Sequence, residues 1–449
     1  MSKENYVSTT NACKLCTPLG ATLAFRGVEN AVPFLHGSQG CATYMRRYII
    51  SHFREPMDIA SSALGEKHAV YGGAPNLKKG LLNVMKKYDP RVIGVASTCL
   101  TETIGDDVPR ILMEFKKEFG DLDLPEVVHV STASYKGTHM DGWTNAVCAI
   151  AEQLVTEKVA DNGSVNLCAG LISPEDIRHL KDIFEHFALT ANVLPDISDT
   201  LDGQALLDYE TIPSGGTPLE SIRSMSGAAC TLEFGRCLPK KTAGTVLEGR
   251  FNVENRRLGM PIGLRESDAF MDTLAELSGR AIPRRYTMER GRFIDAMVDG
   301  HKYIAGKRAI VYGEEDLVVG LVSFLSEIGI QPVLAATGAR TSQFAKAIEE
   351  VSGPLRELPA IHAGVDFHEI AEMAGELKPD IVIGHSKGYR YARDWNVPLV
   401  RVGFPIHDRF GGQRLRTLGY GGAQNLYDRI VNAVLTKKQA DSVVGYGYL

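Results

Sequence analysis

The stretch "FLHGSQGCATYMRRY", residues 34–48, joins an apolar run to a helical pattern and places one cysteine near the junction. Short apolar runs bounded by glycine are typical of buried strands. The stretch therefore predicts a strand, a tight connection and a helix that begins close to Cys41. At the N-terminus of a helix, the backbone N–H groups and the helix dipole favour an anion, so a cysteine in this position is readily a thiolate.

The same alternation of β-rich runs and longer amphipathic segments continues along the chain. The runs that predict strands are "RVIGVAS" (91–97), "SVNLCAGLIS" (164–173), "RAIVYG" (308–313), "QPVLAATG" (331–338), "DIVIGH" (380–385) and "PLVRVGFP" (398–405). Strands that alternate with helices indicate parallel sheets built from βαβ units. Because there are too many strands for one sheet of ordinary width, we expect an α/β fold of three Rossmann-like domains with mostly parallel sheets, over residues 1–158, 159–285 and 286–449.

Composition excludes several classes of protein. The chain has 449 residues and a net charge of −5, which argues against a nucleic-acid-binding protein. No apolar run approaches the roughly 18 residues that a membrane span needs, and the start "MSKENYVSTT" shows no secretory signal, so we expect a cytoplasmic protein with no membrane partner. Neither G-x-x-x-x-G-K-S/T nor G-x-G-x-x-G after a strand occurs, which argues against a P-loop ATPase and a nicotinamide-dependent enzyme.

Three of the eight cysteines are expected to converge. Cys41 follows "AVPFLHGSQG", Cys99 follows "RVIGVAST", and Cys16 lies in "CKLCTPLGATLAF", an N-terminal lead that opens a helix. Because the carboxyl ends of parallel strands share one edge of a sheet, Cys41 and Cys99 should meet there, with Cys16 beside them. Thiolates bind iron, but an ordinary four-iron cluster needs four ligands, so a partner chain or another residue type must supply the rest.

Other interpretations of the cysteines are open at this point. "CKLC" is a C-x-x-C, so Cys13 can contribute to a zinc site, although a second C-x-x-C is absent. A thioredoxin-like redox pair of Cys13 and Cys16 is disfavoured because no strand precedes the motif. His36 and His52 flank the cysteine loops and either neighbour a cluster or bond to the backbone. The cysteines expected to serve packing alone are Cys148, Cys168, Cys230 and Cys237.

These residues also carry a resemblance to a known family. The segments "CTPLGATLAFRGVENAVPFLHGSQGCATYMRRYIISHFREP", "STCLTETIGDD" and "GTHMDGWTN" resemble the β subunit of molybdenum–iron nitrogenase. The similarity continues through "LGMPIGLRESDAFMDTLAELSG", "ERGRFIDAMVDGHKYIAGKRAIVYGEEDLVVGLVSFL" and "PLVRVGFPIHDR", so it covers nearly the whole chain. The resemblance implies the nitrogenase component 1 architecture and an oxidoreductase subunit.

In that family the β subunit contributes three cysteines to an eight-iron, seven-sulfur P-cluster (8Fe-7S), which the α subunit completes. The matching residues are Cys16, Cys41 and Cys99, and Ser134 in "STASYKG" matches a serine that can ligate one iron in the oxidised cluster. The resemblance implies an α-type partner in an α₂β₂ heterotetramer. It also implies an ATP-dependent iron protein that sends electrons through the cluster to a cofactor in the α-type subunit, where the substrate is reduced.

A second metal site is indicated by "FIDAMVDG" and "HFREP". Asp295 and Asp299 are four residues apart on a predicted helix and so share a face, and with Glu55 they can hold a hard divalent cation. The resemblance implies that the matching residues form a metal site between two β subunits. The alternative is a solvated helix face with an incidental acidic pair.

Departures from the molybdenum-nitrogenase pattern keep a second function open. "CKLC", the end "VVGYGYL" and a lead of only 15 residues before Cys16 differ from that subunit. The short lead fits a nitrogenase-like reductase such as methylthio-alkane reductase, or a scaffold for iron–molybdenum cofactor biosynthesis. The family's scaffold β subunit keeps only the cysteine that matches Cys41 and shares a 4Fe-4S cluster, so Cys16, Cys99 and Ser134 favour the reductase. A third hypothesis is an iron-free ligand-binding or glycosyl-transfer protein whose cysteines are structural.

Overall fold

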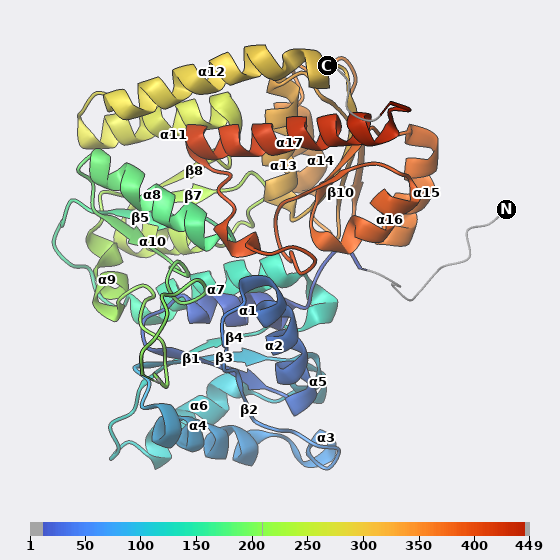
Figure 1. Cartoon of the computed structure of the whole chain (residues 1–449). Helices are drawn as coiled ribbons and strands as arrows, with labels where there is room; N and C mark the ends of the chain where they lie inside the picture. Colours follow the sequence, from blue (N-terminus) through green and yellow to red (C-terminus); the bar gives the residue numbers. More distant parts are fainter. Residues whose placement is uncertain (1–11, 209, 445–449) are drawn as a thin grey trace.

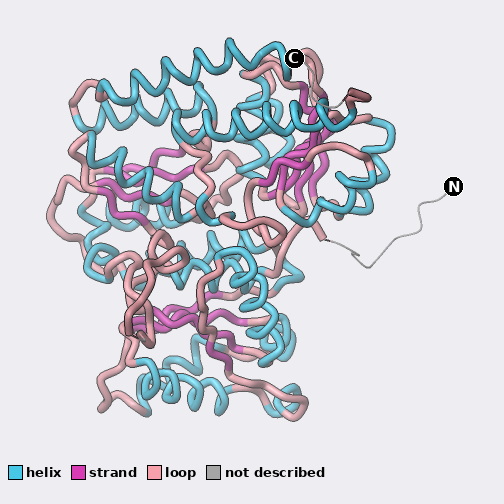
Figure 2. The backbone as a smooth tube through the Cα atoms, viewed as in Figure 1, coloured by secondary structure: helices cyan, strands magenta, loops and turns pink. Residues whose placement is uncertain are grey.

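Three parallel sheets follow one another along the chain, and one lies in each of the three predicted ranges (Figure 1 and Figure 2). The computed structural model describes residues 12–208 and 210–444. Every strand pairing within the three sheets is parallel. The predicted α/β class with parallel sheets is therefore confirmed, while the domain boundaries themselves stay a prediction.

The first sheet has the strand order β2-β1-β3-β4 and positions the cysteine site. Its strands are β1 (Ala31–His36), β2 (Ala60–Ser61), β3 (Val92–Ser97) and β4 (Glu126–Val130). Its helices are α1 (Thr17–Arg26), α2 (Gln39–Phe53), α3 (His68–Tyr71), α4 (Ala74–Tyr88), α5 (Cys99–Ile104), α6 (Val108–Glu118) and α7 (His139–Leu154), with the 3₁₀ turn η1 (Ser134–Lys136). β1 and β3 are buried along their whole length and pair from Ala31↔Val92 to His36↔Ser97, so both end at the same edge.

The second sheet has the order β6-β5-β7-β8, and the third has the order β11-β10-β9-β12-β13. The second contains β5 (Val165–Cys168), β6 (Ala191–Val193), β7 (Cys230–Phe234) and β8 (Glu254–Leu258), with α8 (Pro174–His186), α9 (Leu219–Arg223), η2 (Ser224–Gly227) and α10 (Ala243–Phe251). The third contains β9 (Arg308–Gly313), β10 (Gln331–Thr337), β11 (Ala360–Ala363), β12 (Ile381–Gly384) and β13 (Leu399–Arg401), with α13 (Glu315–Glu327), α14 (Gln343–Val351), α15 (Phe367–Leu377), η3 (Ser386–Gly388) and α16 (Tyr389–Asp394).

Three long helices lie along the edge of the molecule that is farthest from the first sheet (Figure 1). They are α11 (Gly263–Ser278), α12 (Arg284–Ile304) and α17 (Gly419–Asp441), and the turn η4 (Gly412–Arg414) precedes the last of them. Tyr427 of α17 is buried and donates its hydroxyl hydrogen to the carbonyl of Met297 on α12 at 3.1 Å. None of the helices in the described ranges is both long and apolar enough to cross a membrane.

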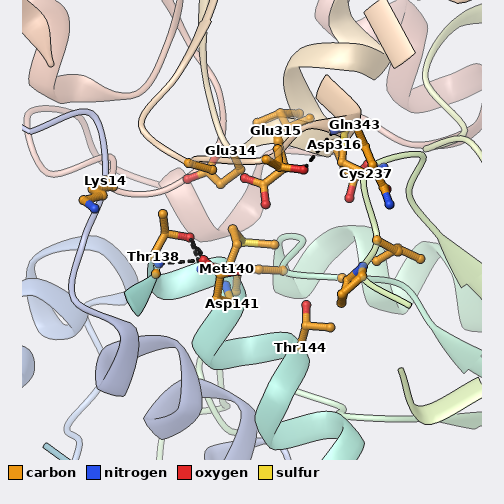
Figure 3. Close-up of a pocket in the computed structure, with 18 of the residues that line it drawn as sticks. Lys14, Thr138, Met140, Asp141, Thr144, Cys237, Glu314, Glu315, Asp316 and Gln343 are labelled. Atoms are coloured by element: carbon orange, nitrogen blue, oxygen red, sulfur yellow. Dashed lines mark hydrogen bonds between the residues drawn. The ribbon is translucent and has the colours of Figure 1, made fainter. Parts of the chain in front are cut away.

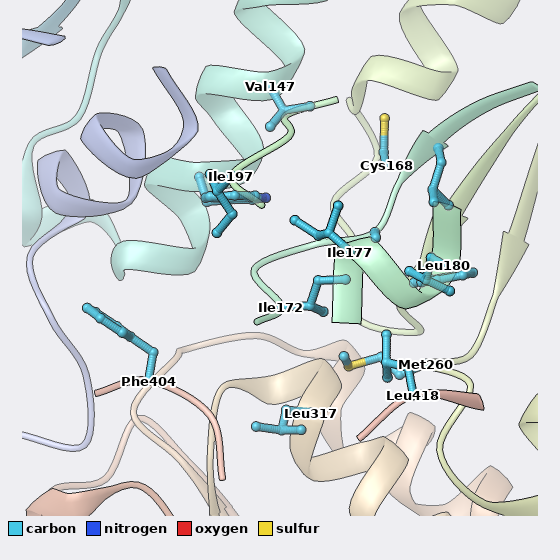
Figure 4. Packing of buried hydrophobic residues seen from close by; sticks show 14 of the residues in the cluster. Val147, Cys168, Ile172, Ile177, Leu180, Ile197, Met260, Leu317, Phe404 and Leu418 are labelled. Atoms are coloured by element: carbon cyan, nitrogen blue, oxygen red, sulfur yellow. The ribbon is translucent and has the colours of Figure 1, made fainter. Parts of the chain in front are cut away.

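One core of buried apolar side chains joins the three sheets. Figure 4 shows Val147 of α7 on one side, Cys168 of β5 and Ile177 of α8 beyond it, and Leu317 of α13 and Phe404 across from them. Each sheet buries side chains against the other two, so the three sheets hold each other in place. This packing fixes the relative positions of residues that are far apart in sequence.

Candidate iron–sulfur site

Four predicted site residues each lie at the start of a helix or turn on the first sheet's edge. Cys16 is the N-cap residue of α1, Cys41 lies in the first turn of α2, and Cys99 is the first residue of α5. Ser134 begins η1, shortly after β4 ends. Since β1, β3 and β4 are neighbours, the connections that follow them lie side by side at the carboxyl ends of the strands.

Hydrogen bonds join Ser134 to Cys99 and to Thr17, the residue after Cys16. The backbone N–H of Ser134 donates to Sγ of Cys99 at 3.2 Å, and its Oγ accepts from the backbone N–H of Thr17 at 3.2 Å. Ser38, the N-cap residue of α2, donates its hydroxyl hydrogen to Sγ of Cys41 at 3.6 Å. Ser134 therefore connects Cys99 to the residue after Cys16, and polar hydrogens already point at two of the three sulfurs.

The described residues do not by themselves stabilise the thiolate form of Cys16. Burial raises the pKa of the Cys16 thiol; a hydrogen bond with Ser134 lowers it, and the nearby Cys99 and Cys41 thiols raise it. Burial is the largest of these effects, so the Cys16 side chain favours the protonated thiol when no metal is bound. The same result shows that the three cysteines lie close enough for their charges to interact.

The other five cysteines do not belong to this group. The four predicted to serve packing, Cys148, Cys168, Cys230 and Cys237, are buried, and none of the eight forms a disulfide. Cys13 is also buried, and its Sγ lies 3.9 Å from Nε2 of His385. Burial raises the pKa of the Cys13 thiol to about 12. Within the described ranges, no three His, Cys, Asp or Glu side chains surround a single ion position.

The two histidines that flank the cysteine loops have structural contacts. His36 is fully buried at the end of β1, where its ring nitrogens lie 2.9 Å from Oγ of Ser62 and 3.0 Å from Oδ2 of Asp106. His52 accepts a hydrogen bond from the backbone N–H of Ile406 at 2.8 Å. His52 therefore bonds to the backbone, as one of the two interpretations predicts, while His36 bonds to side chains instead.

A cavity of about 440 Å³ lies near the cysteines, where elements of all three sheets meet (Figure 3). Lys14, Thr138 and Asp141 line one side, and Glu315 and Asp316 at the start of α13 line the other. Burial, followed by the charge of Asp316, raises the pKa of Glu315 to about 8. Basic side chains, Lys14, Lys136 and Arg340, line the cavity together with the acidic ones, and none of Cys16, Cys41 and Cys99 is among its lining residues.

The chain is similar to the proteins of one known family. Residues 16–435 match the family described as nitrogenase component 1 type oxidoreductase. The chain belongs to the nitrogenase component 1 family. Its sequence is 34% identical over 428 residues to the nitrogenase molybdenum-iron protein beta chain of Clostridium pasteurianum, which covers 95% of this chain and 93% of that relative.

Two further matches support a β-type subunit of this nitrogenase component 1 oxidoreductase family. A chain of the solved structure "Nitrogenase Cp1 at pH 6.5" matches with a TM-score of 0.95 and 32% identity, over 100% of this chain and 98% of that one. The nitrogenase iron-molybdenum cofactor biosynthesis protein NifN of Bradyrhizobium diazoefficiens is 34% identical over 433 residues, 95% of this chain and 90% of that protein. The β-type set thus includes both catalytic and biosynthetic relatives.

The three predicted metal-binding carboxylates of this nitrogenase component 1 chain lie on separate elements. Glu55 follows α2, where burial and Asp202 raise the pKa of its carboxyl. Asp295 and Asp299 lie exposed on α12. No cation site of three such side chains forms within the described part of one copy.

Two residues near the cysteines escape the sequence analysis. Ser38 bonds to Cys41, and the signal for it is its position as a serine N-cap just before a helix. Tyr44 is 45% exposed and near enough to Cys16 for the ionised forms of the two groups to repel. Tyr44 follows Cys41 by three residues, a spacing that puts both on one helix face.

Proposed function

We propose that this chain holds a P-cluster (8Fe-7S) jointly with an α-type partner and relays electrons from an ATP-dependent iron protein to a cofactor in that partner. The observation that carries this proposal is the proximity of Cys41 and Cys99 to Cys16 at one edge of the first sheet, with Ser134 bonded to Cys99 and to the residue after Cys16. All four are partly exposed. Thiols that are open at the surface of one subunit suit a cluster that a second subunit completes.

The donor set fits an anionic iron–sulfur cluster. When bound, the cluster would supply one-electron transfer. Cys16, Cys41 and Cys99 would hold its iron as thiolates, and the metal would offset the desolvation that raises the pKa of Cys16. The N–H of Ser134 and the O–H of Ser38 point at the sulfurs of Cys99 and Cys41, and such hydrogen bonds tune the reduction potential of a cluster. The hydroxyl of Ser134 would provide a further ligand.

The same site favours a working reductase over an assembly scaffold. A scaffold of this family, in the resemblance stated above, keeps only the cysteine that matches Cys41, whereas this chain also holds Cys16 and Cys99 beside Ser134. We propose a reductase of the nitrogenase or methylthio-alkane reductase class within an α₂β₂ heterotetramer. The likeness to NifN makes a scaffold with a 4Fe-4S cluster the second candidate.

We also propose that Glu55 of one copy and the pair Asp295 and Asp299 of another bind a divalent cation between the two β-type subunits. The exposed pair on α12 supports this, because two carboxylates one helical turn apart face the same way.

The test is the iron and acid-labile sulfide content of the complex, purified anaerobically with its α-type partner, together with electron paramagnetic resonance. We expect eight irons at the interface of each pair of subunits and an oxidisable P-type signal. Cys99→Ala should lose this iron and its signal but keep the fold, since Cys99 is partly exposed at a helix start. The matched control is Cys148→Ala in α7, which removes a buried thiol outside the site and should keep the iron.

Three other outcomes would count against the reductase or against its proposed ligands. Four irons of the ordinary cubane kind, together with no detectable turnover, would make the scaffold the function. A complex without iron would reject both candidates, and a Cys99→Ala complex that retains the full signal would reject this assignment of ligands.

A further inference from the structure

The four residues before Cys16 are held by elements of the third sheet. Nζ of Lys387, in η3 after β12, donates to the carbonyl oxygens of Ala12 and Lys14, the second at 3.3 Å. A Cβ added at Gly338, at the end of β10, would lie only 2.4 Å from backbone of this segment. The segment 12–15 therefore lies against the carboxyl ends of strands that are more than 300 residues away in sequence.

His139 holds the backbone of Leu15 at two points. The N–H of Leu15 donates to Nδ1 of His139 at 3.3 Å, and the backbone N–H of His139 donates to the carbonyl of Leu15 at 3.0 Å. His139 is the first residue of α7 and is 4% exposed. It belongs to the motif "GTHMDGWTN", whose Thr138 and Asp141 form the capping box of the same helix.

The other ring nitrogen of His139 contacts Glu314, the N-cap residue of α13. Nε2 of His139 lies 3.2 Å from Oε1 of Glu314, and both side chains are 5% exposed. Because Nδ1 accepts from Leu15, the ring proton of a neutral His139 must be on Nε2, which donates to Glu314. Burial opposes ionisation of Glu314, but the hydrogen bond from His139 holds the pKa of this carboxyl below its usual value.

Cys16 is thus bracketed by two fixed backbone groups. Leu15, before it, is bonded to His139, and Thr17, after it, donates to Ser134. The direction of the Cys16 side chain follows from these two anchors, and metal sites require ligand positions to be held within about 0.5 Å. Figure 3 shows Glu314 on the opposite side of the cavity from Thr138, the residue that precedes α7.

We propose that His139 and Glu314 are positioning residues for Cys16, through which the third sheet fixes the place of a cluster ligand in the first. Glu314 selects the ring tautomer, His139 holds Leu15, and Leu15 sets the backbone of Cys16. This inference rests on the proposed cluster, but the hydrogen bond to Leu15 can be tested without it.

The test compares His139→Leu with His139→Asn in the complex with the α-type partner. Asparagine places its amide oxygen where Nδ1 of histidine lies, so it keeps an acceptor for Leu15, whereas leucine removes it. Hydrogen exchange of the peptide that contains residues 12–18 reports on the Leu15 amide. Electron paramagnetic resonance and the midpoint potential report on the cluster. We expect exchange at Leu15 about fivefold faster or more in His139→Leu, with an altered cluster signal and potential, and recovery of both in His139→Asn.

A second variant and a control separate this role from general damage. Glu314→Gln removes the carboxylate that orients the ring, and it should reproduce a weaker form of the same changes. His179→Leu makes the same substitution at an equally buried histidine of α8, whose Nε2 has no hydrogen-bond partner, and it should change neither readout.

Two outcomes would overturn the inference, and a third would reject the proposed function. Faster exchange with an unchanged cluster signal and potential would overturn the inference, because the pair would then serve folding alone. Equal defects in His139→Leu and His139→Asn would also overturn it, because side-chain volume would be the cause. A wild-type complex without the eight-iron cluster would instead reject the proposed function, while the exchange experiment would still show whether His139 holds Leu15.

Discussion

Buried carboxylates of this chain accept hydrogen bonds from the backbone of remote segments. Asp176, in the first turn of α8, accepts from the N–H groups of Thr417 at 2.7 Å and Leu418 at 2.9 Å. Asp316 accepts from the N–H groups of Arg236 and Cys237 at 2.6 and 2.7 Å. At the scale of single residues, such side chains connect segments that share no secondary structure, and they carry a charge into the core to do so.

The stability of the protein should depend on pH through Asp176. Burial raises the pKa of Asp176 to about 6, against the hydrogen bonds from Leu418 and Thr417 that lower it. A raised carboxyl pKa means that the folded state favours the proton, so this contribution is full below the unfolded pKa and is lost as the pH rises through about 6. Asp176→Asn keeps the acceptor oxygen and can donate to Oγ1 of Thr417, so it should remove this dependence.

The measurement is the thermal unfolding midpoint of both proteins from about pH 4 to about pH 7.5. The asparagine variant should gain relative to the wild type as the pH rises, by on the order of 2 kcal/mol at neutral pH. Parallel curves for the two proteins would show that Asp176 does not titrate in this range.

At the scale of elements, the contact between α1 and α7 places Cys16 beside Ser134. Two glycines allow this contact: a Cβ at Gly20 would lie 1.7 Å from the carbonyl oxygen of His139, and one at Gly142 would lie 1.8 Å from that of Thr17. The backbones of the two helices therefore touch at both positions. Only glycine permits this distance, since any side chain would force the helices apart.

Gly142→Ala should separate α1 from α7 and disturb the cluster site. The added methyl group collides with the carbonyl of Thr17, whose N–H bonds to Ser134, so the hydrogen bond to Ser134 should be strained. We expect a loss of stability of about 1–3 kcal/mol and a lower iron content, measured by thermal unfolding and metal analysis.

The control for this substitution is Gly249→Ala in α10. A Cβ there meets nothing within 4 Å, so alanine should stabilise the helix by about 0.5–1 kcal/mol. If Gly142→Ala behaved like this control, the close packing of α1 on α7 would not determine the site.

The elements also show where sequence patterns suffice. The run "RAIVYG" is β9 with the predicted bounds, and "RVIGVAS" differs from β3 by one residue. Both runs contain β-branched and apolar residues that are mostly buried, so the sequence pattern is enough to predict the strand. β8 is "ENRRL", a polar edge strand of the second sheet, and β6 has three residues. Neither is predicted, because such strands are stabilised by pairing with a neighbour rather than by their own composition.

At the scale of the whole molecule, we expect assembly to complete both metal sites. The double variant Asp295→Asn and Asp299→Asn should lose the divalent cation that we propose between two copies, because the amides are weaker, uncharged ligands for a hard cation. Metal analysis of the washed complex gives the cation content, and analytical ultracentrifugation gives the size. We expect less bound cation and a shift from the heterotetramer toward half-size particles.

The matched control is Glu372→Gln with Glu376→Gln on α15, an exposed pair with the same spacing. It should leave both measurements unchanged. Equal cation content in the Asp295 and Asp299 variant and the wild type would leave this pair as a solvated helix face.

The sequence by itself determined the parallel α/β class, the family, and the placement of Cys41 and Cys99 after neighbouring strands. The fold class and the strand positions depend on period, β-branched composition and turn residues, all of which act between near neighbours in the chain, whereas the family follows from the resemblance of whole segments. Tertiary structure alone decided that Leu15 bonds to His139 and that His139 meets Glu314, 175 residues later. Those contacts arise because three sheets share one core and two helices touch at glycines, and packing of this kind leaves no local pattern in a sequence.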